Sequence, residues 1–304
     1  MEKKAIIFYH KVDYDGLFSC CAVLKFLKKQ PEYTVVNEYG YTYGDQIPEF
    51  SEIVKIYDTI FIVDLGFPSD VMIFLKNSGR EIIWLDHHET WISTSERDGF
   101  SDLPGKREIG VGACEITWKY LFSKWKTPKF LEYLSAYDVW NKSRFSWESL
   151  IYPLQLALKL KIGMNLERAY KIWPNLKGEY LNNLVMKGRE LAKYEKQRNK
   201  SYVGCYSFPI TVAEKYRGIA MLTPSFTSTI FDSVKDDYQV YCCMNIKHGT
   251  LPTLSLYCEE GAVDINLGEY LISKYGERAG GHACSCGTSL SMKEFMDILI
   301  NKRI

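Results

Sequence analysis

The chain has 304 residues, of which 46% are hydrophobic and 25% charged, so it can form ordinary buried cores and is long enough for two domains. It contains no apolar run of the roughly 18–20 residues that cross a membrane, and its N-terminus carries no secretory signal pattern, so we expect a soluble, cytoplasmic protein without membrane partners. Proteins that track long nucleic acids usually carry an excess of basic residues, whereas the net charge of this chain is only +1. The charge balance therefore favours short or small phosphorylated substrates.

The first third of the chain alternates between expected strands and helices. Strands are predicted at residues 5–9, 60–63 and 81–85, where short apolar runs end in polar residues. Helices are predicted at residues 17–29, 46–57 and 69–78. This alternation is typical of an α/β domain with a parallel sheet and helices on both of its faces. Such sheets bind ligands beyond the carboxyl ends of their strands.

The pattern turns helical between about residues 112 and 200. Within it, the charged stretch 177–200 is predicted to be an exposed helical linker. Further strands are predicted at residues 208–213, 238–244 and 253–258, with a helix near 265–275. The expected organisation is an N-terminal domain (1–176), the linker, and a smaller α/β C-terminal domain (201–304).

The nine cysteines are odd in number and show no spacing typical of a disulfide framework, so we expect reduced thiols. Cys284 and Cys286 would suit a zinc site only with a second pair at a matching spacing, which the sequence does not contain. We interpret them as small residues of a tight loop.

Five clusters of acidic, imidazole or glycine residues follow strands or lie in loops. They are His10 with Asp13 and Asp15, then Asp64, then Asp86-His87-His88, then Asp138, and finally Gly280-Gly281-His282. Four of the five histidines in the chain lie in these clusters. A single aspartate at a strand end is often a helix cap or a turn former, and a glycine pair is often a plain turn. The complete set therefore indicates a site that no single member would indicate.

Converging carboxylates suit divalent cations. Mn²⁺ and Mg²⁺ prefer carboxylate oxygens, and Mn²⁺ also binds imidazole. Two such ions about 3.5–4 Å apart can hold the attacking and leaving oxygens of a phosphoryl transfer. Strand-end loops of a parallel sheet bring distant residues to one point, and Asp13 and Asp15 can face the same cavity because they are two residues apart.

The ordered set resembles the DHH family of phosphoesterases, named for the triplet found here as Asp86-His87-His88. The family's Asp-x-Asp-Gly segment is similar to Asp13-Tyr14-Asp15-Gly16, and its isolated strand-end aspartate to Asp64. Further resemblances are carried by Gly110-Val111-Gly112, by Asp138, and by Gly280-Gly281-His282 of an associated C-terminal domain. The resemblance therefore extends over nearly the whole chain.

The resemblance implies a site for two Mn²⁺ ions, with Mg²⁺ as the alternative. One ion would be held by His10, Asp13 and Asp64, and the other by Asp15, Asp64, His87 and Asp138. His88 would stabilise charge on the scissile phosphate, and Asp86 would orient the histidines. Gly280, Gly281 and His282 would contact a substrate phosphate or base across a cleft between the domains, with Arg278 as a further candidate.

Three features depart from the family pattern. His10 precedes Asp13 by three residues, where several branches have four. The stretch Ser255-Leu256-Tyr257-Cys258 lacks the arginine that often binds substrate in the C-terminal domain, and Ala283-Cys284-Ser285-Cys286 replaces small apolar residues.

The function implied by the resemblance is a metal-dependent phosphohydrolase that cleaves short oligonucleotides or dinucleotides. Cyclic dinucleotides are a related substrate of this family. The alternatives are a small-molecule phosphatase acting on a nucleotide 3′-phosphate or polyphosphate, and a non-catalytic nucleotide-binding module that kept the fold. The sequence leaves the oligomeric state open.

Overall fold

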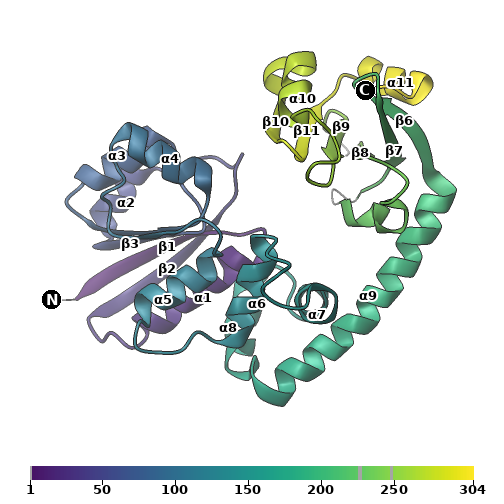
Figure 1. The fold of residues 1–304 in the computed structure, drawn as a ribbon. Helices are drawn as coiled ribbons and strands as arrows, with labels where there is room; N and C mark the ends of the chain where they lie inside the picture. The colour runs from purple at the N-terminus through teal and green to yellow at the C-terminus, as the bar shows by residue number, and fades with distance from the viewer. Residues whose placement is uncertain (1, 225–227, 247–248) are drawn as a thin grey trace. The chain divides into compact units, whose positions relative to one another are not determined.

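The computed structural model describes residues 2–224, 228–246 and 249–304. The chain divides into two compact units, Met1–Ala192 and Lys193–Ile304 (Figure 1). Within the described ranges, no helix combines the length and the apolar character that a membrane crossing requires.

The first unit is built on a five-stranded parallel sheet with the order β2-β1-β3-β4-β5. The strands are β1 (Lys3–His10), β2 (Tyr33–Tyr41), β3 (Thr59–Val63), β4 (Glu81–Asp86) and β5 (Gly105–Arg107). The three predicted strands are confirmed as β1, β3 and β4, at the centre of the sheet. The edge strands β2 and β5 do not form apolar runs in the sequence, because most of their side chains are exposed or half-buried.

The central strands are buried on both faces, which explains why they read as continuous apolar runs. The aligned residues Ile7, Phe61 and Ile83 belong to one core, and the next row of the sheet belongs to the other. That next row is Phe8, Ile62 and Trp84. Successive side chains of a strand point to opposite faces, so a single apolar run supplies both cores.

Helices cover both faces of the sheet, which confirms the predicted α/β fold class (Figure 1). The core that contains Ile7 is covered by α1 (Tyr14–Leu27), α5 (Ala113–Leu121), α6 (Lys129–Asp138), α7 (Tyr152–Lys161) and α8 (Leu166–Ile172). The opposite core is covered by α2 (Phe50–Ile56) and α3 (Ser69–Asn77), and α4 (Glu89–Asp98) follows β4. Short helical turns at Trp147–Ile151 and Trp173–Asn175 complete the predicted helical stretch.

The strand register brings the polar clusters to one edge of the sheet. Tyr9 is paired with Val63, and Val63 with Leu85. The residues that follow these three positions are His10, Asp64 and Asp86. They therefore lie side by side at the carboxyl ends of parallel strands, where this class of sheet binds ligands.

The second unit contains a six-stranded mixed sheet with the order β10-β11-β9-β8-β7-β6. Its strands are β6 (Ser207–Val212), β7 (Tyr216–Leu222), β8 (Val240–Asn245), β9 (Thr253–Tyr257), β10 (Ala279–His282) and β11 (Ser285–Ser289). The predicted strands correspond to β6, β8 and β9, and the predicted helix to α10 (Leu267–Tyr275). Together with α11 (Met292–Asn301), α10 packs on one face of this sheet.

A single helix, α9 (Gly178–Tyr206), contains the division between the units. Its first half packs into the first unit through Leu181, Leu184 and Val185, and Val203 packs into the second. Two glycines of α9 differ in their surroundings. Gly188 is buried, and a Cβ there would collide with the backbone carbonyl of Pro153 at the start of α7, whereas a Cβ at Gly204 would meet no atom within 4 Å.

The two glycines give a matched test of how α9 is attached to the first unit. We expect Gly188→Ala to lower the free energy of unfolding by about 1–3 kcal/mol, because α9 and α7 must move apart. Gly204→Ala should raise it by about 0.5–1 kcal/mol, because alanine favours the helix without a new contact. Calorimetric unfolding of both variants measures the difference, and equal effects would contradict the packing of α9 on α7.

Candidate metal centre

The predicted ligands of the first unit converge at the carboxyl end of its sheet. The described residues form three groups whose ligand atoms lie within 4.8 Å of one another: His10 with Asp13 and Asp64, Asp64 with His87 and His88, and Asp15 with His87 and Asp138. All six predicted metal ligands are included. The first two groups share Asp64, which places this carboxylate between His10 of β1 and the two histidines that follow β4.

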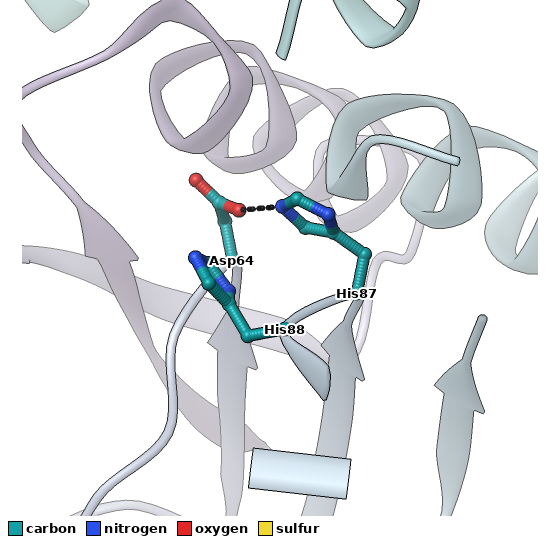
Figure 2. Close-up of side chains that lie close together, drawn as sticks. All are labelled: Asp64, His87 and His88. Carbon is teal, nitrogen blue, oxygen red and sulfur yellow. Dashed lines mark ion pairs between the residues drawn. The ribbon is translucent and has the colours of Figure 1, made fainter. Parts of the chain in front are cut away.

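Asp64 follows β3 in a left-handed backbone conformation, with φ at 59°, and its side chain is buried. Its Oδ1 lies 3.2 Å from Nε2 of His87, and its Oδ2 lies 3.7 Å from Nδ1 of His10. Figure 2 shows the rings of His87 and His88 directed toward this carboxylate. Burial and the nearby carboxylates Asp13 and Asp15 raise the pKa of Asp64 well above its ordinary value.

Asp13 and His10 form the first side of the centre. Asp13 is the N-cap of α1, accepting a hydrogen bond from the Gly16 amide at 2.8 Å through Oδ1. Its Oδ2 lies 2.5 Å from Nδ1 of His10. A side chain at Gly16 would collide with the His10 carbonyl, so the glycine permits this close approach. The contact between His10 and Asp13 shows that a spacing of three residues is compatible with both side chains facing the same centre.

Asp15 is fully buried and is held by the N-terminus of α5. Its carboxylate accepts hydrogen bonds from the amides of Ala113 at 2.5 Å and Cys114 at 2.9 Å. Burial and the charge of Asp138 raise the pKa of Asp15 to about 6. A Cβ at Gly112 would lie 2.7 Å from Cα of Ser135 and 2.9 Å from Oδ1 of Asp15. The glycine-rich segment thus allows α5 to approach the carboxylate closely.

His87 joins Asp138 to the same centre, with its Nε2 lying 3.1 Å from Oδ2 of Asp138 at the end of α6. Burial alone would lower the pKa of His87, but its interactions with Asp138 and Asp64 outweigh burial and raise the pKa to about 11. The imidazole therefore carries a proton that partly balances the surrounding carboxylates. A bound cation could replace that positive charge.

The arrangement fits divalent cations. Four carboxylates meet in a largely buried site, where like charges repel strongly. Both oxygens of Asp64, Nδ1 of His10 and Nε2 of His87 are buried, and although they face one another or a neighbouring carboxylate, none of them makes a well-aligned hydrogen bond. Buried polar atoms normally make such bonds, and a metal ion would satisfy these four.

Asp86 and His88 form a different kind of pair beside this centre. Oδ1 of Asp86 accepts hydrogen bonds from the amides of His87 and His88 and lies 2.8 Å from Nδ1 of His88. Asp86 is fully buried, and its contact with Nδ1 orients the His88 ring and leaves Nε2 for another partner. This geometry supports the predicted orienting role of Asp86.

Tyr43 and Trp91 also border the centre, although the sequence motifs do not identify them. The Tyr43 ring lies 5.7 Å from that of His10 and 6.5 Å from that of His88, between centroids. Its hydroxyl accepts a hydrogen bond from the Trp91 indole at 2.7 Å, and the two rings are stacked. Only the tertiary fold brings Tyr43, which follows β2, to this edge.

The remaining predicted residues belong to the second unit. Gly280, Gly281 and His282 lie in β10 and are exposed. Gly281 has φ at 129°, and a Cβ there would lie 2.5 Å from Cα of Cys286, so this position requires glycine for the β10–β11 pairing. Arg278 forms a two-pronged ion pair with Glu294, at 2.9 and 2.8 Å, so its guanidinium already has a partner within its own unit.

Comparison with known proteins gives one family match. Residues 4–135 match the model of the DHH family, N-terminal domain. Among curated protein sequences, no match is found.

Solved structures with the same fold have low sequence identity. An exonuclease RecJ bound to manganese is 15% identical with a TM-score of 0.55, over 98% of this chain and 88% of that one. The pGpG-specific phosphodiesterase PggH from Vibrio cholerae is 14% identical with a TM-score of 0.54, over 99% and 97% of the two chains. A DHH domain described as belonging to a family of ribosomal proteins is 16% identical with a TM-score of 0.60, over 98% and 85%. At these identities the likeness establishes the fold.

Asp64 offers a direct test of the metal centre. If its carboxylate contacts both ions, Asp64→Asn should reduce bound Mn²⁺ and lower any hydrolytic rate by at least about 100-fold, the scale at which loss of strong charge stabilisation acts. Asp58→Asn is the matched control, because Asp58 lies directly before β3 and accepts hydrogen bonds from the Lys4 backbone amide and the Arg80 guanidinium, away from the centre. Elemental analysis and calorimetric titration measure occupancy, and equal losses in the two variants would refute the assignment.

Replacing His87 and replacing His88 should have different effects on metal binding and on catalysis. His87→Ala should lower metal occupancy, because its Nε2 faces Asp64 and Asp138. His88→Ala should retain both ions and lower kcat, because a group that contacts developing charge acts mainly in the transition state. Mn²⁺ titration together with steady-state kinetics separates the two effects. Loss of an ion from His88→Ala would show that His88 is itself a ligand.

Proposed function

We propose a substrate class for this chain, in which residues 4–135 match the model of the DHH family, N-terminal domain. The chain hydrolyses phosphodiester bonds of short oligonucleotides or dinucleotides, using two divalent cations of which Mn²⁺ is the first choice. The observation that carries this proposal is the shared position of Asp64 in two ligand groups, one with His10 and Asp13 and one with His87 and His88.

The residues of the first unit have separate tasks in this proposal. His10, Asp13 and Asp64 hold one ion, and Asp15, Asp64, His87 and Asp138 hold the other. When bound, such ions polarise the phosphoryl group and acidify a water molecule. His88, held by Asp86, donates a hydrogen bond to the phosphate as negative charge develops.

The choice of a short substrate rests on charge and on the second unit. The net charge of +1 offers little general attraction for a long polyanion. His282 is exposed in β10, so its ring is accessible to a substrate phosphate or base, and Gly280 and Gly281 carry no side chain that would block the approach. We assign substrate binding to Gly280, Gly281 and His282. Arg278 could bind a substrate phosphate only after its ion pair with Glu294 is broken.

The names of two similar structures describe enzymes that act on substrates of this class. One is an exonuclease and the other acts on a linear dinucleotide, pGpG. A phosphatase for nucleotide 3′-phosphates or polyphosphate would use the same ions and is the second candidate. A non-catalytic nucleotide-binding module fits less well, because all six ligand positions are filled and brought together.

One hydrolysis screen distinguishes these functions. The full chain, stripped of metal and supplied with Mn²⁺, should cleave dinucleotides faster than longer RNA or DNA, cyclic dinucleotides, adenosine 3′,5′-bisphosphate and polyphosphate. Chelation should abolish the activity, and Mn²⁺ should restore it. Preference for the bisphosphate or for polyphosphate would favour the phosphatase, and binding of nucleotides without any turnover would favour the non-catalytic module.

A further inference from the structure

Three aromatic residues form a cluster directly beside Asp138. The rings of Tyr137, Trp140 and Trp147 have centroids 5.0–6.1 Å apart, with planes inclined by 8–26°. Tyr137 and Asp138 end α6, Trp140 follows in the next turn, and Trp147 begins the helical turn that precedes α7. The nearly parallel rings of Tyr137 and Trp140 therefore lie within two residues of a predicted metal ligand.

Trp140 does not serve the core. It is 51% exposed, whereas the core tryptophans Trp84 and Trp173 are 0% and 6% exposed. Its backbone has φ at 52°, a conformation that bulky residues rarely adopt. Hydrogen bonds from the amides of Trp140 to Tyr137 and of Asn141 to Ala136 hold this turn in place. Such conformations persist where the surroundings enforce them, and they concentrate at binding sites.

A flexible lysine lies over the exposed Trp140 ring and the half-buried Trp147 ring. The ammonium group of Lys142, an exposed residue, lies 5.3 Å from the ring centroid of Trp140 and 5.7 Å from that of Trp147. A flexible lysine can leave such a position at small cost, because exposed cation–π contacts contribute only about 0.5–1 kcal/mol. A planar group can take its place, and the released ammonium can then approach a phosphate.

We propose that Trp140, with Tyr137 and Trp147, forms a nucleobase-stacking subsite for the nucleotide whose phosphate is bound beside Asp138. This inference rests on the proposed function and adds a basis for selectivity. Every nucleobase has a π-face, so stacking accepts all bases, whereas polyphosphate and sugar phosphates have none to offer. The subsite therefore favours nucleotides as a class and discriminates weakly among bases.

The test compares a dinucleotide with an otherwise identical abasic dinucleotide, using the full chain with Mn²⁺. Trp140→Ala should raise KM for the dinucleotide about tenfold with a smaller change in kcat, which is the scale of losing one stacked base. Its effect on the abasic compound should be much smaller. Trp140→Phe should recover most of the affinity, because a ring is restored.

Trp125→Ala is the matched control. Trp125 is also exposed, at 67%, but lies after α5 beside Lys29, away from the predicted ligands. Its replacement should change neither substrate's KM. Metal content of each variant shows whether Asp138 has moved. Equal losses for the dinucleotide and the abasic compound in Trp140→Ala would overturn the subsite and show a structural role.

A binding measurement keeps this inference separate from the proposed function. Calorimetry of the wild type with adenosine 5′-monophosphate and with ribose 5-phosphate should show tighter binding of the nucleotide, and Trp140→Ala should remove the difference. Wild type that cleaves no dinucleotide yet shows this difference would refute the proposed function and retain the subsite. Equal affinities for the two ligands would refute the subsite whatever the enzyme hydrolyses.

Discussion

Mutual repulsion among buried and half-buried carboxylates is the constraint around which the first unit is organised. Asp13, Asp15, Asp64 and Asp138 approach one another where water cannot screen them well. Each is therefore held by a different part of the fold. Asp13 caps α1, Asp15 accepts amides from the start of α5, Asp64 is held by an unusual backbone, and Asp138 ends α6. The same crowding raises the pKa of His87, and together with burial it raises the pKa of Asp64.

The sequence was sufficient for the parts of the fold that depend on burial alone. β1, β3 and β4 are apolar runs followed by polar residues, so both the sheet and its ligand-binding edge could be predicted. The edge strands β2 and β5 could not, because exposed side chains give no periodic signal. In the second unit β10 contains two glycines and β11 small or polar residues, so their pairing depends on β9 rather than on local propensity.

The candidate site was predictable to the extent that its residues form ordered motifs. The residues that surround the site were harder to predict from the sequence. The ion pair between Arg144 and the buried Glu115 joins residues 29 positions apart and lowers the pKa of Glu115 to about 2, although burial opposes this. Tyr43 reaches His10 and His88 only because β2 lies beside β1. Such contacts arise from tertiary packing, which local patterns do not encode.

Strain provides a link between the metal centre and the aromatic cluster. Asp64 and Trp140 both have positive φ without being glycine. Asp64 is itself a predicted ligand directly after β3, and Trp140 follows α6, which ends at the predicted ligand Asp138. A residue in this conformation costs about 1–2 kcal/mol, so the rest of the unit must enforce it. In Asp64 the unusual backbone places both oxygens of a buried carboxylate toward histidines of two strands. In Trp140 it turns the chain sharply after Asp138 and leaves an indole exposed beside it. A change that relaxed either turn would stabilise the backbone locally. It would also move a side chain that the proposed chemistry needs, so stability and activity are expected to conflict at these two positions.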